Sequence, residues 1–235
     1  MLQAKVVPIE RLEMSFAPRP WPFAEQHRSE IDAHFAARRQ AIPELWNGRV
    51  LLMHEHTIDG ATFRGSFLLA DFASFLWWRD RGLPDTGVID CFAQGAILAA
   101  DGAFLLGVMG PHTANAGHIY FPSGTPDPSD LSGSTVDLDA SVWREMAEET
   151  GLTAAELAPD PGWHTVLSGA RIAHIRTMRA GEDAAAMRRR ILDTLARQQK
   201  PELSDIRIVR GPADLDPMMP AFVKAFLTAV WAKAD

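Results

Sequence analysis

The hydrophobic pattern of the chain predicts strands joined by tight turns, with helices between them. Two Asp-Gly pairs, Asp59-Gly60 and Asp101-Gly102, each lie between two apolar stretches. An Asp-Gly pair in this position is a strong hairpin signal, so two β-hairpins are expected. Their strands are expected at 49–57 with 62–70 and at 88–100 with 103–108, and further extended segments at 6–16, 117–122, 164–168, 172–177 and 206–210.

Helices are expected where apolar residues recur at helical spacing among charged ones. Pro43 stops the first of them, and Gly82 and Gly151 follow two others. The expected helices are 23–42, 72–81, one from Asp137 or Asp139 to Thr150, 183–199 and 217–233. Residues 1–86 are therefore expected to form a helix–hairpin–helix extension, and a second block, 87–235, to carry the remaining strands and helices.

Composition is that of a folded globular protein and narrows the range of partners. Of the 235 residues, 47% are hydrophobic and 23% are charged. The net charge of −7 argues against non-specific binding to nucleic acid or to an anionic membrane. The single cysteine, Cys91, excludes an intrachain disulfide framework and a cysteine-rich zinc site. Because no apolar run suits an export signal or a membrane span, a cytoplasmic protein is expected.

The segment 144–152, with the sequence REMAEETGL, carries the strongest chemical signal. At about 100° per residue on a helix, Glu145, Glu148 and Glu149 share one arc, and a separate arc is nearly all apolar. One side of the helix is therefore expected to pack on the core while the other presents three carboxylates. Arg144 lies at the edge of the acidic arc, one turn from Glu148.

Three ionised carboxylates so close together repel one another, and two arrangements relieve the repulsion. Water can screen them on an exposed helix face, which is the ordinary situation for such a run. A divalent cation can instead bind among them, and Mg²⁺ prefers oxygen ligands and retains several waters. An ion held in this way can bind diphosphate oxygens and activate a water molecule.

The segment resembles the second half of the Nudix box, G-x5-E-x7-R-E-U-x-E-E-x-G-U, in which U is a bulky aliphatic residue. Position by position, the matching residues are Arg144, Glu145, Glu148, Glu149 and Gly151. The resemblance implies an α/β fold: a Nudix-type α/β/α sandwich with a mixed sheet, here carrying an N-terminal α+β extension. It also implies that Mg²⁺ or Mn²⁺ is held by Glu145, Glu148 and Glu149. In the same way it implies that Glu145 acts as catalytic base, that Arg144 orients a glutamate by ion pairing, and that Gly151 ends the helix.

The first half of the box departs from the pattern. Val136 stands where the box has glutamate, and Asp130 where it has glycine. A better match starts at Gly124, from which five residues lead to Asp130, and about six residues are then inserted before Arg144. Asp137 is the other acid that fits the upstream position, so the choice between Asp130 and Asp137 stays open.

Segments before the box add a broader resemblance. Glu44-Leu45-Trp46-Asn47, Phe63-Arg64 and Ala70-Asp71-Phe72, together with the expanded box, are similar to the Nudix hydrolases of UDP-glucose and UDP-galactose. An acid outside the box often completes the metal site in this family, and Glu182 and Glu202 are both available for it.

The expected activity is Mg²⁺-dependent hydrolysis of the diphosphate linkage in a nucleoside diphosphate derivative, with a UDP-sugar as one candidate substrate. The alternative is a non-catalytic Nudix-fold protein that binds a nucleotide or a protein. The expected partner is a small-molecule nucleotide, with neither nucleic acid nor membrane, and a homodimer is left open.

Overall fold

The computed structural model describes residues 4–233, whose strands form two mixed sheets. The larger sheet contains β1 (Lys5–Ile9), β5 (Asp90–Leu98), β6 (Phe104–Met109), β7 (Ile119–Tyr120), β10 (Leu157–Pro159), β11 (Trp163–Ser168), β12 (Arg171–Ala180) and β13 (Leu203–Val209). Its order is β1-β11-β12-β5-β6-β13, with β10 beside β12 and β7 beside β6. The smaller sheet, in the order β3-β4-β2-β9-β8, contains β2 (Arg11–Phe16), β3 (Arg49–Asp59), β4 (Thr62–Asp71), β8 (Leu131–Ser132) and β9 (Thr135–Val136).

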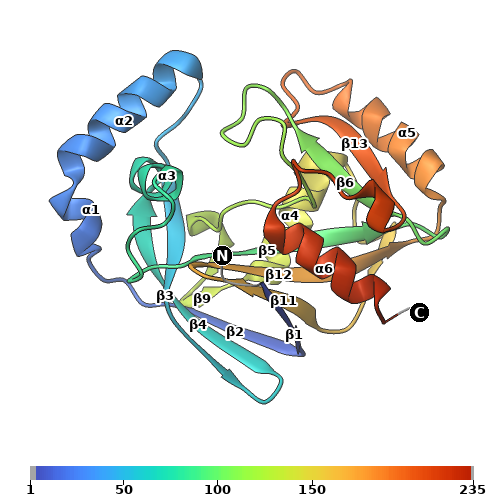
Figure 1. The fold of residues 1–235 in the computed structure, drawn as a ribbon, viewed down its shortest axis with the longest axis horizontal. Coiled ribbons are helices and arrows are strands. Elements are labelled where there is room, and N and C mark those ends of the chain that lie inside the picture. Colours follow the sequence, from blue (N-terminus) through green and yellow to red (C-terminus); the bar gives the residue numbers. More distant parts are fainter. Residues whose placement is uncertain (1–3, 234–235) are drawn as a thin grey trace.

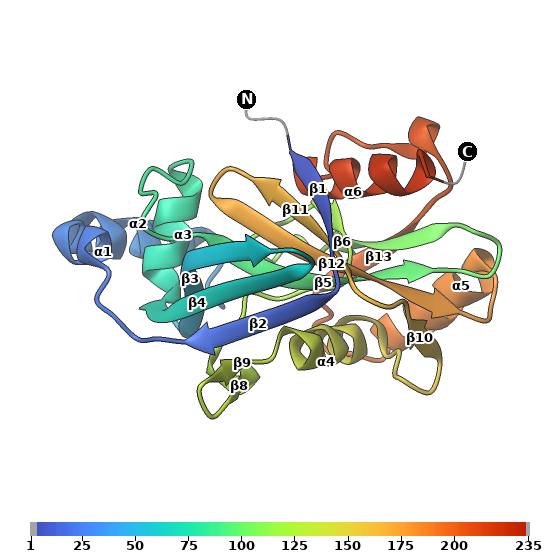
Figure 2. The ribbon, with the colours of Figure 1, turned by 90° about the horizontal axis from the view of Figure 1, so that it is seen from below.

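The helices are α1 (Pro22–Gln26), α2 (Arg28–Ala41), α3 (Phe72–Asp80), α4 (Leu138–Thr150), α5 (Ala184–Leu195) and α6 (Ala221–Trp231). Figure 2 shows α4 on one side of the larger sheet and α6 on the other. Gly95 of β5 lets α4 pack closely, since a Cβ there would lie 2.3 Å from Met146 Cε. On the opposite face, Phe226 of α6 packs edge-on against Phe104 and Phe121. The predicted α/β/α sandwich with a mixed sheet is confirmed, with β5 and β12 parallel and their outer neighbours antiparallel.

The N-terminal helices pack beside the smaller sheet (Figure 1). Asp71 caps α3 by accepting a hydrogen bond from the Ser74 amide, and Arg28 of α2 pairs with the same carboxylate at 3.0 Å. Trp77 and Trp78 of α3 are buried in a second hydrophobic cluster under these helices. Among residues 4–233 no helix is long and apolar enough to cross a membrane.

The N-terminal extended segment forms two strands in different sheets. The sequence predicts one segment over 6–16, but β1 pairs antiparallel with β11, whereas β2 pairs parallel with β4. The break is at Glu10, where the Glu10 and Arg11 amides both donate to the Ala61 carbonyl. Pro8 suits β1 because β1 is an edge strand, where a missing amide is tolerated. The extension therefore contributes a strand to the larger sheet, and a division near residue 86 stays a proposal.

Several expected boundaries are wrong. The helix expected over 23–42 is interrupted at His27, whose ψ of 22° lies outside helical geometry. The final helix starts at Ala221 because Pro220 precedes it as the N-cap. The polar loop over 123–135 contains a 3₁₀ turn, Pro128–Asp130, and two short strands, β8 and β9. β10 was not expected, since three residues carry too little pattern to indicate a strand.

His174 of β12 gives the fold a pH dependence that can be measured. It is fully buried, with Nδ1 2.8 Å from Thr165 Oγ1 and the ring edge-on to Phe63. Burial lowers the pKa of His174 to about 3, whereas the unfolded chain has the ordinary value of about 6.5. The unfolded state therefore binds a proton first as the pH falls, and stability is lost from pH 6.5 downward.

We expect this residue alone to cost about 2 kcal/mol of unfolding free energy between pH 6.5 and pH 5. Urea denaturation at pH 7, 6 and 5 gives the slope of the unfolding free energy against pH, and this slope should be smaller in His174→Gln. The exposed His118, replaced in His118→Gln, is the control and should retain the wild-type slope. Equal slopes in wild type and His174→Gln would contradict the assignment.

Candidate active site

Helix α4 has defined ends that fix the position of its acids. Asp137 is the N-cap, and its side chain accepts a hydrogen bond from the Ala140 amide at 2.9 Å. Gly151 ends the helix with φ of 74°, a left-handed conformation that glycine adopts without strain. A Cβ at Gly151 would also lie 2.7 Å from Thr194 Cγ2 of α5. Asp137 thus has a structural role at one end and Gly151 at the other.

Glu149 is a buried carboxylate with one unpaired oxygen. The residue is only 4% exposed, on the side of α4 that also buries Met146. Its Oε2 accepts a hydrogen bond from the Ser123 amide at 3.3 Å, while Oε1 is buried without a partner. Burial raises the pKa of Glu149, and the charge of Glu145 adds to the effect. A charged Glu149 is therefore unfavourable unless a cation or a proton accompanies it.

Glu145 lies beside Glu149 and is held by a loop and an arginine. Its side chain is 12% exposed and accepts from Arg144 Nη1 at 2.6 Å. Burial raises the pKa of Glu145 to about 7, although Arg144 acts in the opposite direction. The loop approaches so closely at Gly124 that a Cβ there would lie 2.1 Å from Glu145 Oε1. Any side chain at 124 would therefore require the Glu145 carboxylate to move.

Arg144 joins α4 to the inserted loop through Asp130. Its Nη2 lies 3.0 and 3.2 Å from the two Asp130 oxygens, and the Asp130 side chain is only 2% exposed. Arg144 also lies 3.7 Å from Glu148, whose side chain is 61% exposed. Of the two upstream acids that the sequence leaves open, Asp130 is thus the one paired with Arg144.

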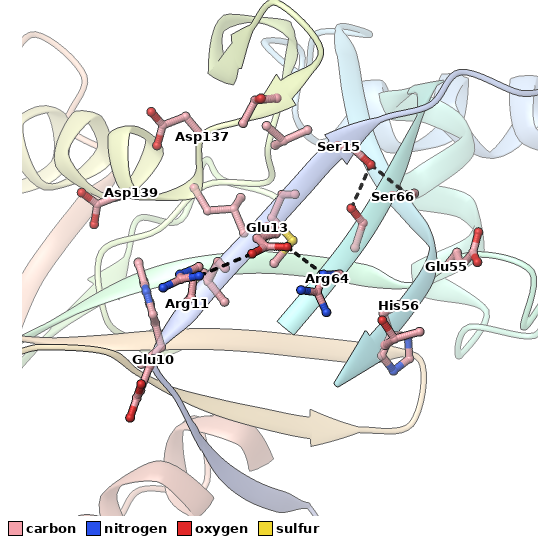
Figure 3. Close-up of a pocket in the computed structure, with 18 of the residues that line it drawn as sticks. Glu10, Arg11, Glu13, Ser15, Glu55, His56, Arg64, Ser66, Asp137 and Asp139 are labelled. Carbon is pink, nitrogen blue, oxygen red and sulfur yellow. Dashed lines mark hydrogen bonds and ion pairs between the residues drawn. The ribbon is translucent and has the colours of Figure 1, made fainter. Parts of the chain in front are cut away.

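A hollow of about 890 Å³ lies at the start of α4, and Asp137 and Asp139 are among the residues that line it (Figure 3). Within it, Arg64 pairs with Glu13 at 2.7 Å, Arg11 lies 3.9 Å from the same carboxylate, and Arg176 pairs with Asp139. The acids at the other end of α4 are not among its lining residues. Asp137 therefore faces a separate, solvated surface.

The donor set of the acidic cluster (Glu145, Glu148 and Glu149) suits a hard divalent cation, because it offers carboxylate oxygens, one of them buried and unpaired. In the described part of the chain, however, no three His, Cys, Asp or Glu side chains are gathered as a metal site would require. Arg144 engages Glu145, and Glu148 is exposed, so these side chains would have to converge on an ion.

The structure also distinguishes between Glu182 and Glu202, the two acids outside the box that could complete the metal site. The negative charge of Glu202 raises the pKa of both Glu145 and Glu149, so Glu202 lies within electrostatic reach of the cluster. Glu182 instead pairs with Arg190 at 3.0 Å. Glu202 is therefore the better placed of the two to complete a metal site.

A cleft of about 510 Å³ adjoins the acidic cluster (hereafter the cleft). The loop over 123–125, which contacts Glu145 and Glu149, forms part of its lining. Phe92 and Arg171 line it from the larger sheet, Phe222 from α6, and Arg79 from α3. Sequence reasoning missed these residues, since they come from distant segments and match no motif.

Comparison with known proteins gives structural similarity only. No family model matches the sequence, and no curated protein matches it. The chain is similar to a Nudix hydrolase from M. smegmatis, RenU, with 19% identity over 61% of this chain and 84% of that chain and a TM-score of 0.38.

Two further solved structures give similar values. For the MutT protein from Methanosarcina mazei Go1 the identity is 20%, the coverage 63% of this chain and 96% of that chain, and the TM-score 0.39. For an Ap4A hydrolase from C. elegans the identity is 20%, the coverage 60% and 98%, and the TM-score 0.37. All three TM-scores are below 0.5, so these structures carry no information on the function of this chain.

Proposed function

We propose that the protein is a Nudix-type pyrophosphohydrolase that cleaves the diphosphate linkage of a nucleoside diphosphate derivative with Mg²⁺ or Mn²⁺. The observation that carries the proposal is Glu149, a buried carboxylate with an unpaired oxygen next to a second acid of raised pKa. A helix that only needed a solvated polar face would not bury this charge, because burial without a partner is costly. The adjoining cleft supplies room for a substrate.

The glutamates of α4 can support hydrolysis of the diphosphate by an attacking water molecule. Water attacks one phosphorus of the diphosphate, the bond from that phosphorus to the bridging oxygen breaks, and Glu145 accepts the proton of the attacking water. A bound divalent cation neutralises charge on the diphosphate and lowers the pKa of water. Glu145, Glu148 and Glu149 would hold it, with Glu202 close by.

A UDP-sugar is the first substrate to test. The support is the resemblance of segments before the box to UDP-glucose and UDP-galactose hydrolases, together with the inserted loop over the site. The cleft, at about 510 Å³, lies within the range of roughly 300–1,000 Å³ typical of small-molecule sites. The products would be a nucleoside monophosphate and a phosphorylated sugar.

A non-catalytic nucleotide binder is the second candidate. Two observations favour it: Arg144 engages Glu145 at 2.6 Å, and among residues 4–233 no three His, Cys, Asp or Glu side chains are gathered so that they could hold a metal ion. In a binder this ion pair would be permanent. In an enzyme, Glu145 must turn from Arg144 toward the substrate and the cation.

A substrate panel separates the two candidates. Purified protein is incubated with UDP-sugars, ADP-sugars, dinucleotides and coenzyme A, each with Mg²⁺, with Mn²⁺ and with EDTA. ³¹P NMR and chromatography should show metal-dependent formation of a nucleoside monophosphate from at least one class. Nucleotide binding by calorimetry without cleavage of any compound would support the binder and overturn the enzyme.

A further inference from the structure

Arg79 of α3 is a largely buried cation in the wall of the cleft. Its side chain is 17% exposed, and Nη1 donates to Asn115 Oδ1 at 2.9 Å. Its contact with Asp80 is longer, at 3.6 Å from Nη2 to Oδ1. Its Cζ also lies 5.6 Å from the centroid of the Phe75 ring, and since a guanidinium has five N–H donors, these contacts leave donors free to bind a ligand. Burial lowers the pKa of Arg79, which is the effect of a charge that its surroundings do not fully compensate.

Arg38 of α2 lines the same cleft and shares the same aspartate. Its Nε is buried without a hydrogen-bond partner and lies 3.8 Å from Asp80 Oδ2. The same oxygen lies 2.9 Å from His34 Nε2. One carboxylate therefore serves two guanidinium groups and an imidazole, and the shared negative charge is too small to neutralise both arginines.

The third arginine of the cleft differs, because Arg171 already pairs with the buried Asp90 at 2.8 Å. The uncompensated positive charge thus belongs to Arg38 and Arg79, in a chain whose net charge is −7. A guanidinium fork matches the geometry of phosphate and carboxylate oxygens. An anion that enters the cleft would meet these two donors.

We infer that Arg38 and Arg79 bind phosphate oxygens of the substrate, so that the N-terminal helices α2 and α3 supply part of the active site. The identity of the anion as a diphosphate rests on the proposed function. The acidic cluster repels a diphosphate, and one divalent cation offsets only part of that repulsion. The two arginines supply positive charge from elements that the Nudix-box resemblance does not include.

Calorimetry with nucleotide probes tests the inference without relying on turnover. UDP, ADP, uridine, adenosine and inorganic pyrophosphate are titrated in EDTA and again with Ca²⁺. We expect Arg79→Gln and Arg38→Gln each to weaken UDP or ADP binding by roughly ten- to a hundred-fold, the scale of a lost charge-assisted hydrogen bond. The corresponding nucleosides should bind wild type and variants equally, because they carry no phosphate.

Matched controls lie next to both residues. Arg81, at the end of α3, stacks on Trp77 and is not among the cleft-lining residues, and Arg39 follows Arg38 on α2. Arg81→Gln and Arg39→Gln should retain wild-type UDP and ADP affinity. Arg79→Lys, which keeps the charge but loses the fork, should give an intermediate affinity. If circular dichroism shows that Arg79→Gln is unfolded, the UDP and ADP affinities of Arg79→Lys and Arg38→Gln decide whether the anion site exists.

The inference and the proposed function can fail separately. If no compound is cleaved but the affinities change as expected, the anion site stands and the enzyme assignment fails. If cleavage is intact but UDP, ADP and pyrophosphate bind wild type and both glutamine variants equally, the anion site is wrong. Absence of UDP, ADP and pyrophosphate binding to wild type under both conditions would also overturn it.

Discussion

Glu149→Gln is expected to lower turnover on the order of 10³-fold while making the metal-free protein more stable. Activity falls because a neutral amide is a poor ligand for a hard cation. Stability rises because the neutral amide avoids the cost of burying a carboxylate charge without a cation, although one polar atom of the side chain still has no partner. The pKa of Glu149 is higher in the folded chain than in the unfolded chain, where it is about 4.5. The wild type therefore loses stability as the pH rises from about 4.5 through the folded pKa, and the variant does not.

Two measurements check this prediction. Initial rates with the best substrate of the panel give the loss of turnover, and thermal unfolding at pH 7.5 in EDTA and in Mg²⁺ gives the stability. Mg²⁺ should raise the melting temperature of the wild type but not that of Glu149→Gln. Glu182→Gln, a carboxyl outside the cleft, is the matched control. A variant that is inactive but less stable in EDTA would indicate that Glu149 has a structural role instead.

Asp130→Asn is expected to destabilise the fold by about 1.5–3 kcal/mol, the scale of a lost hydrogen bond to a charged group, whereas Asp137→Asn should change it little. Asp130 is buried and binds Arg144 through both oxygens, so its loss leaves the guanidinium without this partner. Asn at 137 still accepts the amide hydrogen bond that caps α4. Urea unfolding of the two variants gives the difference. Equal losses would show that the Asp130–Arg144 pair contributes nothing particular to stability.

The elements of this fold were predictable where the signal is local. The β3–β4 hairpin follows from Asp59-Gly60, and α4 follows from its cap, its apolar positions and Gly151. The split at Glu10 was not predictable, because the two halves pair with strands far away along the chain. Nor was the break at His27 predictable, because the residues on both sides favour helix and the Trp77 ring, 5.0 Å from that of His27, comes from α3.

The site was predictable in composition but not in geometry. Helical periodicity places the three glutamates on one arc, yet the structure buries Glu149 and exposes Glu148. The difference arises because the loop carrying Ser123 and Gly124 closes over one side of the arc, and no pattern within α4 indicates that contact. Arg38 and Arg79 were missed for the same reason, as isolated arginines on surface helices carry no motif.

The separation of β1 from β2 at Glu10 has a consequence for how the chain is made. During synthesis β2 can pair with β4 early, because β4 ends at Asp71. β1 must wait for β11, which begins at Trp163, so most of the chain has to leave the ribosome before the first strand finds its place. Such non-local pairing slows folding and leaves an unpaired strand exposed to aggregation in the meantime. β1 therefore stays without its partner strand until β11 has been synthesised.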